Sequence, residues 1–125
     1  MKYPLAICLL LLSGAAQADA QLTTEQLKTL ISGNSVSGFA DALGKNYTAY
    51  YAPEGRLVQV LEGKMKRQGS WKITDDARFC TAFPTEKEKC TFIVALGNGQ
   101  YQRVKDDGMA TNTMKKFYKG NAYKY

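Results

Sequence analysis

Turn residues recur about every eight to twelve positions from Tyr47 onward, and this spacing limits the fold more than any other feature of the sequence. Between the turns lie short runs rich in aromatic and β-branched residues, which are typical of antiparallel strands joined by hairpin turns. These runs span residues 46–52, 56–62, 69–74, 78–83, 90–96, 100–105 and 115–119. They predict a mainly β fold of about seven strands, an antiparallel meander that forms a small barrel or a sandwich.

One short helix is predicted before the strands. Thr23 and Gln26 have the spacing of a capping box, and Gly33 provides a stop signal. We therefore expect a helix over about residues 24–32, laid on the sheet by a single apolar stripe. Residues 33–44 contain several glycines and serines and are expected to form an irregular connection between the helix and the first strand.

The first twenty residues have the pattern of a cleaved secretory signal. A lysine precedes an apolar run over residues 5–12, and two overlapping A-x-A sites follow it. Cleavage is expected after Ala20, or else after Ala18. The predicted organisation is a signal peptide at 1–20 and a single β domain at 21–125, located in the periplasm or secreted. The apolar run is far shorter than the roughly 20 residues of a spanning helix, so we expect no transmembrane segment.

Two cysteines remain once the predicted signal, with Cys8, is removed. An even number of cysteines in an oxidising compartment favours a disulfide. Cys80 and Cys90 lie equally far from Thr85, so they face each other if the flanking runs pair as a hairpin about that residue. A redox pair normally has the closer C-x-x-C spacing. We therefore predict a structural disulfide between Cys80 and Cys90.

The residue types that most enzymes use for acid–base chemistry are scarce. The chain has 17 Lys and Arg against 11 Asp and Glu, a net charge of +6, and no histidine. Without histidine it lacks the commonest general base and the commonest metal ligand. The acid pairs Asp75-Asp76 and Asp106-Asp107 fall at predicted turns, where carboxylates are usually solvated. We therefore expect a protein without enzymatic activity, cofactor or metal site.

Basic and aromatic residues gather in two segments and supply the candidate binding residues. A net positive charge attracts acidic partners over a long range. The predicted partner is an anionic polymer of the cell envelope or another exported protein, without specific nucleic-acid recognition; the oligomeric state stays open. A simpler interpretation is that these lysines protect an edge strand from aggregation. The candidates are Lys64, Lys66, Arg67, Lys72, Lys115, Lys116, Tyr118 and Lys119.

Two other functions stay open. Tyr47 and Tyr51 are candidates for the lining of a barrel cavity, where their hydroxyls would orient a small ligand, although such tyrosines also fit a packed core. The turn at 84–89, braced by the predicted disulfide, is the candidate contact loop of an inhibitor of a secreted hydrolase. The hydrophobic core itself is predicted from alternation within strands. It contains Trp71, Ile73, Phe92, Val94 and Leu96.

The motif order resembles that of a group of small exported bacterial proteins without an assigned function. LISGNSVSG at 30–38, YYAPEGRL and GSWKITDDARFC at 69–80 match a "GN-[ST]-V-x-G" loop, a "Y-x-x-x-G" turn and a "G-x-W … C" strand pair. The resemblance covers some forty residues in pieces and implies a secreted β domain with a disulfide. Gly69-Ser70-Trp71 is also similar to the G-x-W of lipocalins, but there the motif lies in the first strand, whereas about two strands precede it here.

Overall fold

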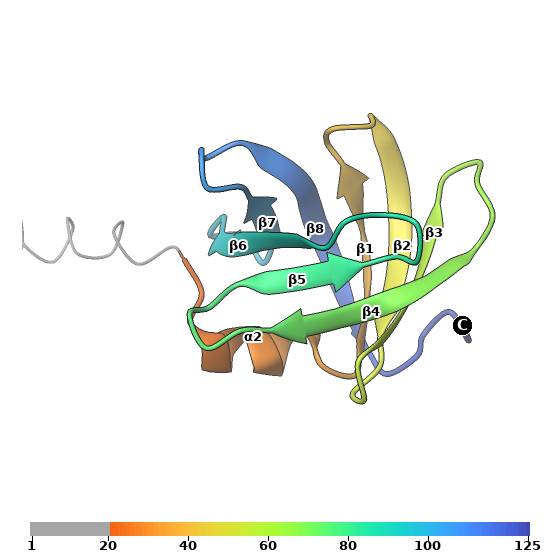
Figure 1. Cartoon of the computed structure of the whole chain (residues 1–125), viewed down its shortest axis with the longest axis horizontal. Coiled ribbons are helices and arrows are strands. Elements are labelled where there is room, and N and C mark those ends of the chain that lie inside the picture. Colours follow the sequence, from red (N-terminus) through yellow and green to blue (C-terminus); the bar gives the residue numbers. More distant parts are fainter. Residues whose placement is uncertain (1–20) are drawn as a thin grey trace, which may run out of the picture.

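A closed antiparallel barrel makes up the body of the protein (Figure 1). The computed structural model describes residues 21–125, and the predicted signal peptide lies outside these residues. The mainly β meander is confirmed, and the sheet closes as a barrel of eight strands because β1 pairs with β8. In chain order the elements are α2 (Thr24–Ile31), β1 (Asn34–Ala40), β2 (Lys45–Tyr51), β3 (Arg56–Leu61), β4 (Arg67–Ile73), β5 (Phe79–Ala82), β6 (Lys89–Ala95), β7 (Tyr101–Val104) and β8 (Ala110–Lys119).

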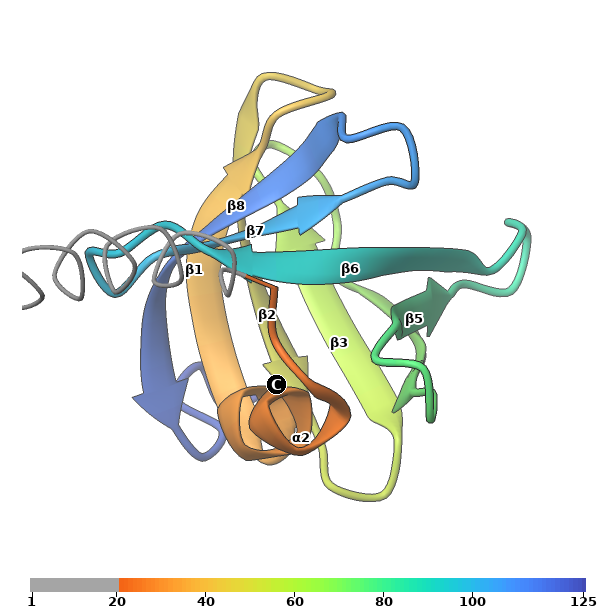
Figure 2. The same cartoon turned by 90° about the vertical axis from the view of Figure 1, so that its left-hand side faces the viewer.

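The two ends of the barrel are built differently. Because consecutive strands are antiparallel neighbours, successive loops alternate between the ends. We call one end the open end; it carries the loops 41–44, 62–66, 83–88 and 105–109. The other, which we call the closed end, carries the remaining loops and α2. Figure 2 shows α2 lying across the lower part of the barrel, away from the β1–β2 and β7–β8 hairpin loops at the top.

Helix α2 closes its end because its apolar stripe faces the barrel interior. The predicted capping box is present, with Thr23 as the N-cap. Leu27 and Ile31 are fully buried. Thr24 donates a hydrogen bond from its hydroxyl to the carbonyl oxygen of Thr74, which ties the helix to the β4–β5 loop. The helix is therefore a plug that belongs to the core.

The segment expected to be an irregular connection instead forms a central strand. Residues 34–40 pair with β2 on one side and with β8 on the other, so the expectation for 33–44 was wrong over most of its length. Glycine and serine are weak strand formers, which is why the pattern is misleading. Gly38 is required by packing: a Cβ atom there would collide with the main-chain oxygen of Thr113 and touch the ring of Tyr47. The pairing with β8 shifts register at the same place.

The core occupies the half of the barrel next to α2. Trp71 and Ile73 pack against it, as predicted. Its central ring is Phe79, which meets Tyr51 edge-on at a centroid distance of 5.4 Å. The fully or largely buried apolar residues of this core are Leu22, Leu27, Ile31, Val36, Ala40, Tyr47, Ala49, Tyr51, Leu57, Phe79, Ile93 and Met114.

The prediction for β6 selected the wrong face of the strand. Phe92, Val94 and Leu96 lie on the outer face, while Ile93 is fully buried inside. Phe92 is partly covered there, because the guanidinium of Arg78 lies 4.3 Å from the centroid of its ring. Gln21 forms a β-bridge with Val94 beside the strand, and Leu96, just past the end of β6, stays exposed. Because β6 has apolar side chains on both faces, the alternation of apolar and polar residues does not show which face points inward.

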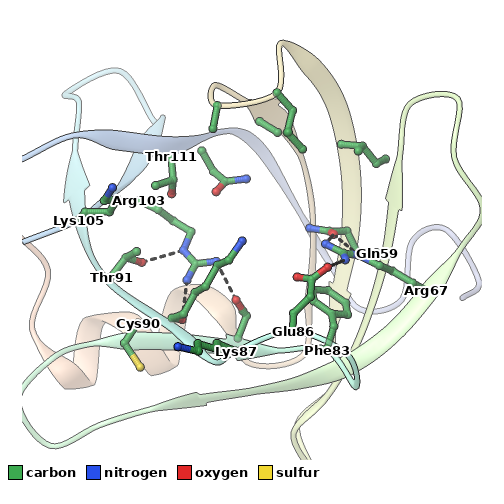
Figure 3. A pocket seen from close by; sticks show the side chains of 17 residues that line it. Gln59, Arg67, Phe83, Glu86, Lys87, Cys90, Thr91, Arg103, Lys105 and Thr111 are labelled. Carbon is green, nitrogen blue, oxygen red and sulfur yellow. Dashed lines mark hydrogen bonds and ion pairs between the residues drawn. The ribbon is translucent and has the colours of Figure 1, made fainter.

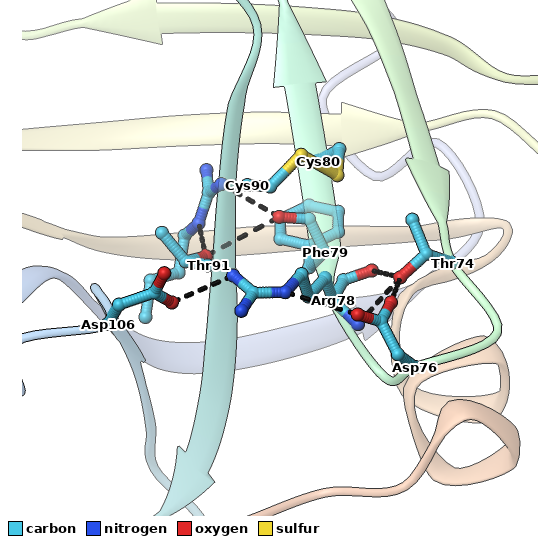
Figure 4. A network of polar contacts seen from close by, with 9 residues as sticks. Thr74, Asp76, Arg78, Phe79, Cys80, Cys90, Thr91 and Asp106 are labelled. Carbon is cyan, nitrogen blue, oxygen red and sulfur yellow. Dashed lines mark hydrogen bonds and ion pairs between the residues drawn. A yellow bond between two sulfur atoms is a disulfide. The ribbon is translucent and has the colours of Figure 1, made fainter.

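The predicted disulfide joins Cys80 of β5 to Cys90 of β6 (Figure 4). The two residues are directly opposed, and the β5–β6 register is centred on Thr85 as predicted. Both cysteines point to the outer side of the barrel, because the neighbouring Phe79 and Thr91 point inward. The disulfide thus closes a short hairpin from the outside.

Replacing Gly38 by alanine should destabilise the barrel, because the added methyl group has to displace main-chain atoms of β8. We expect the free energy of unfolding to fall by about 1–3 kcal/mol. Urea denaturation followed by the fluorescence of Trp71 measures the change. Ser37→Ala, one position earlier on the outer face of the same strand, is the control and should have a much smaller effect; equal losses would contradict this account of Gly38.

Removing the disulfide with Cys80→Ala and Cys90→Ala together should lower stability by about 3 kcal/mol, the value that chain entropy gives for a loop of this length. The barrel should still form, because β5 and β6 also pair with β4 and β7. Circular dichroism and urea denaturation test both statements. An unfolded double variant would show that the hairpin does not form without the covalent link.

Candidate functional site

A cavity of about 560 Å³ opens between the loops of the open end (Figure 3). This volume lies within the roughly 300–1,000 Å³ range typical of small-molecule sites. Its lining combines apolar side chains, including Leu43, Leu61 and Phe83, with hydroxyl, amide and charged groups. Five lining side chains are cationic and one is a carboxylate: Arg67, Lys87, Lys89, Arg103 and Lys105 against Glu86. The cavity is therefore strongly basic.

Arg103 is the buried cation of this cavity. It points inward from β7 and is only 8% exposed. Its Nε donates a hydrogen bond of 2.8 Å to the hydroxyl of Thr91, and its Nη1 donates one of 3.1 Å to the hydroxyl of Thr81. Its Nη2 donates to the carbonyl oxygens of Phe79 and Lys89 at 3.2 and 3.3 Å. The guanidinium thus connects β7 to both strands of the β5–β6 hairpin.

The four acceptors of Arg103 flank the two cysteines. Phe79 and Thr81 stand on either side of Cys80, and Lys89 and Thr91 stand on either side of Cys90. Side chains next to a cysteine on a strand point to the opposite face, so an outward disulfide places the hydroxyls of Thr81 and Thr91 in the interior. The other two acceptors are main-chain oxygens of the same hairpin. The covalent link and the arginine therefore hold the same hairpin from opposite faces.

The charge of Arg103 has no carboxylate partner among residues 21–125, whose ion pairs all involve other residues. Its guanidinium lies 4.5 Å from the centroid of the Phe79 ring. Burial lowers the pKa of Arg103, and nearby Tyr51 and Tyr47 oppose this effect. Arginine stays protonated in proteins because its pKa starts so high. Hydroxyl, carbonyl and ring groups thus solvate a positive charge that no anion of this region neutralises.

Tyr47 and Tyr51 face inward but belong to the packed core and do not line this cavity. Burial raises the pKa of Tyr51 to about 12 and raises that of Tyr47 well above its ordinary value. Both hydroxyls therefore stay neutral at physiological pH and do not act as counter-ions for Arg103. The two tyrosines that the sequence suggested as cavity-lining residues thus lie in the core, and other side chains line this cavity.

Arg67 and Glu86 form one edge of the cavity. Arg67 Nη1 donates to a carboxylate oxygen of Glu86 at 2.8 Å, and its guanidinium stacks 3.5 Å from the centroid of the Phe83 ring. Arg67 also donates two hydrogen bonds to the side-chain oxygen of Gln59. These contacts tie the 83–88 loop, which contains most of the turn at 84–89 predicted as a candidate inhibitor loop, to Gln59 of β3 and to the start of β4.

The other candidate residues are spread over the outside of the barrel. Arg67 alone among them lines the cavity. Lys64 and Lys66 lie on the exposed β3–β4 loop. Lys72 points outward from β4 and forms an ion pair of 3.5 Å with Glu88. The candidates from the last strand are exposed on β8; they are Lys115, Lys116, Tyr118 and Lys119. The structure therefore does not bring the two basic segments into one site.

The C-terminal segment 120–125 packs against the barrel. The hydroxyl of Ser35 donates to the carbonyl oxygen of Gly120 and accepts from the amide of Ala122. The hydroxyl of Tyr125 is hydrogen-bonded to that of Thr48. This segment covers the outer faces of β1 and β2. Its aromatic rings therefore have a structural role.

Asp76 and Asp106, one acid from each predicted turn pair, form ion pairs with Arg78 (Figure 4). Arg78 donates to Asp106 at 2.8 Å and to Asp76 at 3.3 Å, which links the β4–β5 loop to the β7–β8 loop. The hydrogen bond from Thr74 holds the pKa of Asp76 below its ordinary value, and the hydrogen bond to Asp106 raises the pKa of Arg78. These carboxylates lie at the surface, outside the cavity.

Arg103, Thr81 and Thr91 were not among the residues selected from the sequence. One signal for an inward Arg103 was present: it lies two positions from Tyr101, so the two side chains share a face of the run 100–105. Val104 on the other face made that assignment ambiguous. The cavity hydroxyls gave no signal because threonine is common on both faces of a strand.

Cys80, Glu88 and Cys90 lie close enough to form a group of metal ligands, but both sulfurs are in the disulfide and supply no thiolate. Within residues 21–125, no helix has the length and hydropathy needed to cross a bilayer. Comparison of the chain with protein-family models, with curated proteins and with solved structures gives no match. The functional argument therefore depends on the geometry of the cavity.

Replacing Arg103 by lysine should lower the free energy of unfolding by about 1–3 kcal/mol. The lysine keeps a buried charge, but an ammonium group has three donors and cannot match the four acceptors around the guanidinium. Urea denaturation measures the loss. Arg56→Lys is the control: Arg56, whose side chain is 40% exposed, forms one ion pair of 3.4 Å with Glu54, and the exchange should change stability by less than about 1 kcal/mol. Similar losses of unfolding free energy in the two variants would show that the buried contacts of Arg103 do not contribute more to stability than those of a more exposed arginine.

Proposed function

We propose that this protein is a non-enzymatic binding protein that holds a small anionic amphiphile in the open end of its barrel. The acid group lies at Arg103, and the apolar part packs against Leu43, Leu61 and Phe83. The observation that carries this proposal is the buried charge of Arg103, which lines the cavity and has no carboxylate partner among the described residues.

The electrostatics of Arg103 support an anionic ligand. Moving a cation out of water is costly, and an anion in contact recovers much of that cost through charge-assisted hydrogen bonds. A guanidinium has five N–H groups, and four are used within residues 21–125, which leaves one on Nη1. The hydroxyl of Thr81 accepts from Arg103, so its own proton can be donated to a ligand oxygen.

The remaining lining supports an amphiphile rather than a simple inorganic anion. Leu43, Leu61 and Phe83 give the outer part of the cavity apolar surface that a fully polar ion would leave without a partner. Lys87, Lys89 and Lys105 line the same space and raise the local concentration of anions through long-range attraction. The anionic envelope component predicted from the sequence is, on this proposal, a molecule small enough to enter the barrel.

Binding without chemical conversion is proposed because the lining offers no acid–base pair. The chain has no histidine, and Glu86 is the one carboxylate of the cavity, where Arg67 binds it. The proposed location is the periplasm or the extracellular space. Two observations support it: the leader pattern of the first twenty residues and a disulfide that is stable in oxidising compartments.

Three amphiphiles that share one alkyl chain and differ in charge test the proposal: dodecanoate, dodecanol and dodecyltrimethylammonium. Isothermal titration calorimetry below their micelle concentrations should show binding of dodecanoate at least about tenfold tighter than that of the other two, the factor that one charge-assisted hydrogen bond supplies. Equal affinity for all three would overturn the anionic selectivity, and no binding of dodecanoate would overturn the proposal for single-chain acids.

The role of Arg103 is tested with Arg103→Gln, which should abolish the preference for dodecanoate because the buried charge is gone. Lys116→Gln removes the same charge from the outer face of β8 and should leave the affinity unchanged. If Arg103→Gln does not fold, the double variant Lys87→Gln and Lys89→Gln replaces it. This variant should weaken dodecanoate binding and make it less sensitive to salt.

A further inference from the structure

Three large aliphatic side chains are exposed on three different loops of the open end. Leu43 on the β1–β2 loop is 62% exposed, Met65 on the β3–β4 loop 89% and Met109 on the β7–β8 loop 60%. Figure 1 shows these loops as projecting hairpins. A further exposed aliphatic residue, Leu96, lies at the closed end. Single exposed apolar side chains are common on protein surfaces, so what distinguishes these three is their shared position at one end and the charges beside them.

The charged groups beside these side chains favour an anionic surface. Lys64 and Lys66 directly flank Met65, and neither forms an ion pair within residues 21–125. The acids nearest Met109 are engaged: Asp106 with Arg78, and Asp107 with Lys105. Asp41 and Glu62 also lie on the loops of the open end without an ion pair in this described part of the chain. The unpaired Lys64, Lys66 and Lys87 outnumber them, so the net available charge is positive.

We propose that the open end docks on the surface of a bilayer that contains anionic phospholipids. Leu43, Met65 and Met109 enter the boundary between headgroups and acyl chains, while Lys64 and Lys66 contact lipid phosphates. In this orientation the cavity faces the membrane, so an amphiphile passes between bilayer and barrel without crossing bulk water. The passage of an amphiphile into the barrel rests on the proposed function. The docking itself is argued only from the residues of the loops.

A bilayer fits the arrangement better than a protein partner does. The three side chains stand on separate hairpins around the mouth of a cavity, so they form separate points instead of one continuous patch. A fluid surface accommodates separate points, whereas a stable protein interface needs a packed apolar centre. Leu43 connects the cavity with the exposed aliphatic side chains, since it lines the cavity and is also 62% exposed.

Vesicle flotation with the whole exported domain tests the docking. Vesicles of phosphatidylcholine mixed with phosphatidylglycerol should bind the protein, and pure phosphatidylcholine vesicles should bind it several-fold less. Replacing Met65 and Met109 together by serine should weaken binding at least about tenfold, because two apolar insertions are lost. Leu43 is kept in this variant because it also lines the cavity. Leu96→Ser, the same kind of change at the closed end, is the matched control and should bind as the unchanged protein does.

Dodecanoate titration of the double variant Met65→Ser and Met109→Ser separates the two proposals, because neither residue lines the cavity. Near-unchanged dodecanoate affinity together with lost vesicle binding supports docking as a step distinct from ligand binding. If the unchanged protein fails to bind anionic vesicles, or the double variant binds them equally well, the docking proposal is overturned. Vesicle binding that needs the two methionines, without any binding of dodecanoate, supports docking and overturns the ligand proposal. A dimer that the double substitution dissociates, with no vesicle binding, would assign the loops to a protein interface and overturn docking.

Discussion

Closure of the barrel is the constraint on which the rest of the structure depends. β1 has to pair with β2 and β8 at once, and only then does the sheet have no exposed edge. At Gly38 the strands approach so closely that no side chain fits, and the register of β8 shifts there to accommodate the contact. The closed sheet encloses an interior that α2 fills from one end. The cavity at the other end follows from this asymmetry.

Phe79 marks the boundary between the two halves of that interior. One part of its surroundings is aromatic, with Tyr51 and Trp71 at centroid distances of 5.4 and 6.4 Å. Towards the open end its ring lies beneath the guanidinium of Arg103. An apolar core and a polar cavity thus share one wall. A buried charge without a counter-ion is a stability cost that a purely structural core would not carry, and such local costs are typical of functional sites.

The sequence was informative wherever the signal was local. Turn dipeptides located seven of the strands, the capping box located α2, and the symmetry about Thr85 gave the disulfide. It failed where the deciding contact came from elsewhere in the chain. Gly38 is a strand residue because β8 crosses close to it, Phe92 lies outside because Arg78 covers it, and Arg103 is stable inside because the β5–β6 hairpin supplies its acceptors. The alternation of residues within one strand contains no information about contacts with distant segments of the chain.

The disulfide also has a consequence for when the cavity becomes competent. Every acceptor of Arg103 neighbours one of the two cysteines, so the sulfur–sulfur link fixes the cage around the guanidinium before any ligand arrives. A chain that still carries free thiols would hold that cage more loosely and would lose part of the entropic advantage of a preformed site. On the proposed function and location, oxidation would then couple folding to the gain of ligand affinity, and reduced chains would bind the ligand weakly until they reach an oxidising compartment.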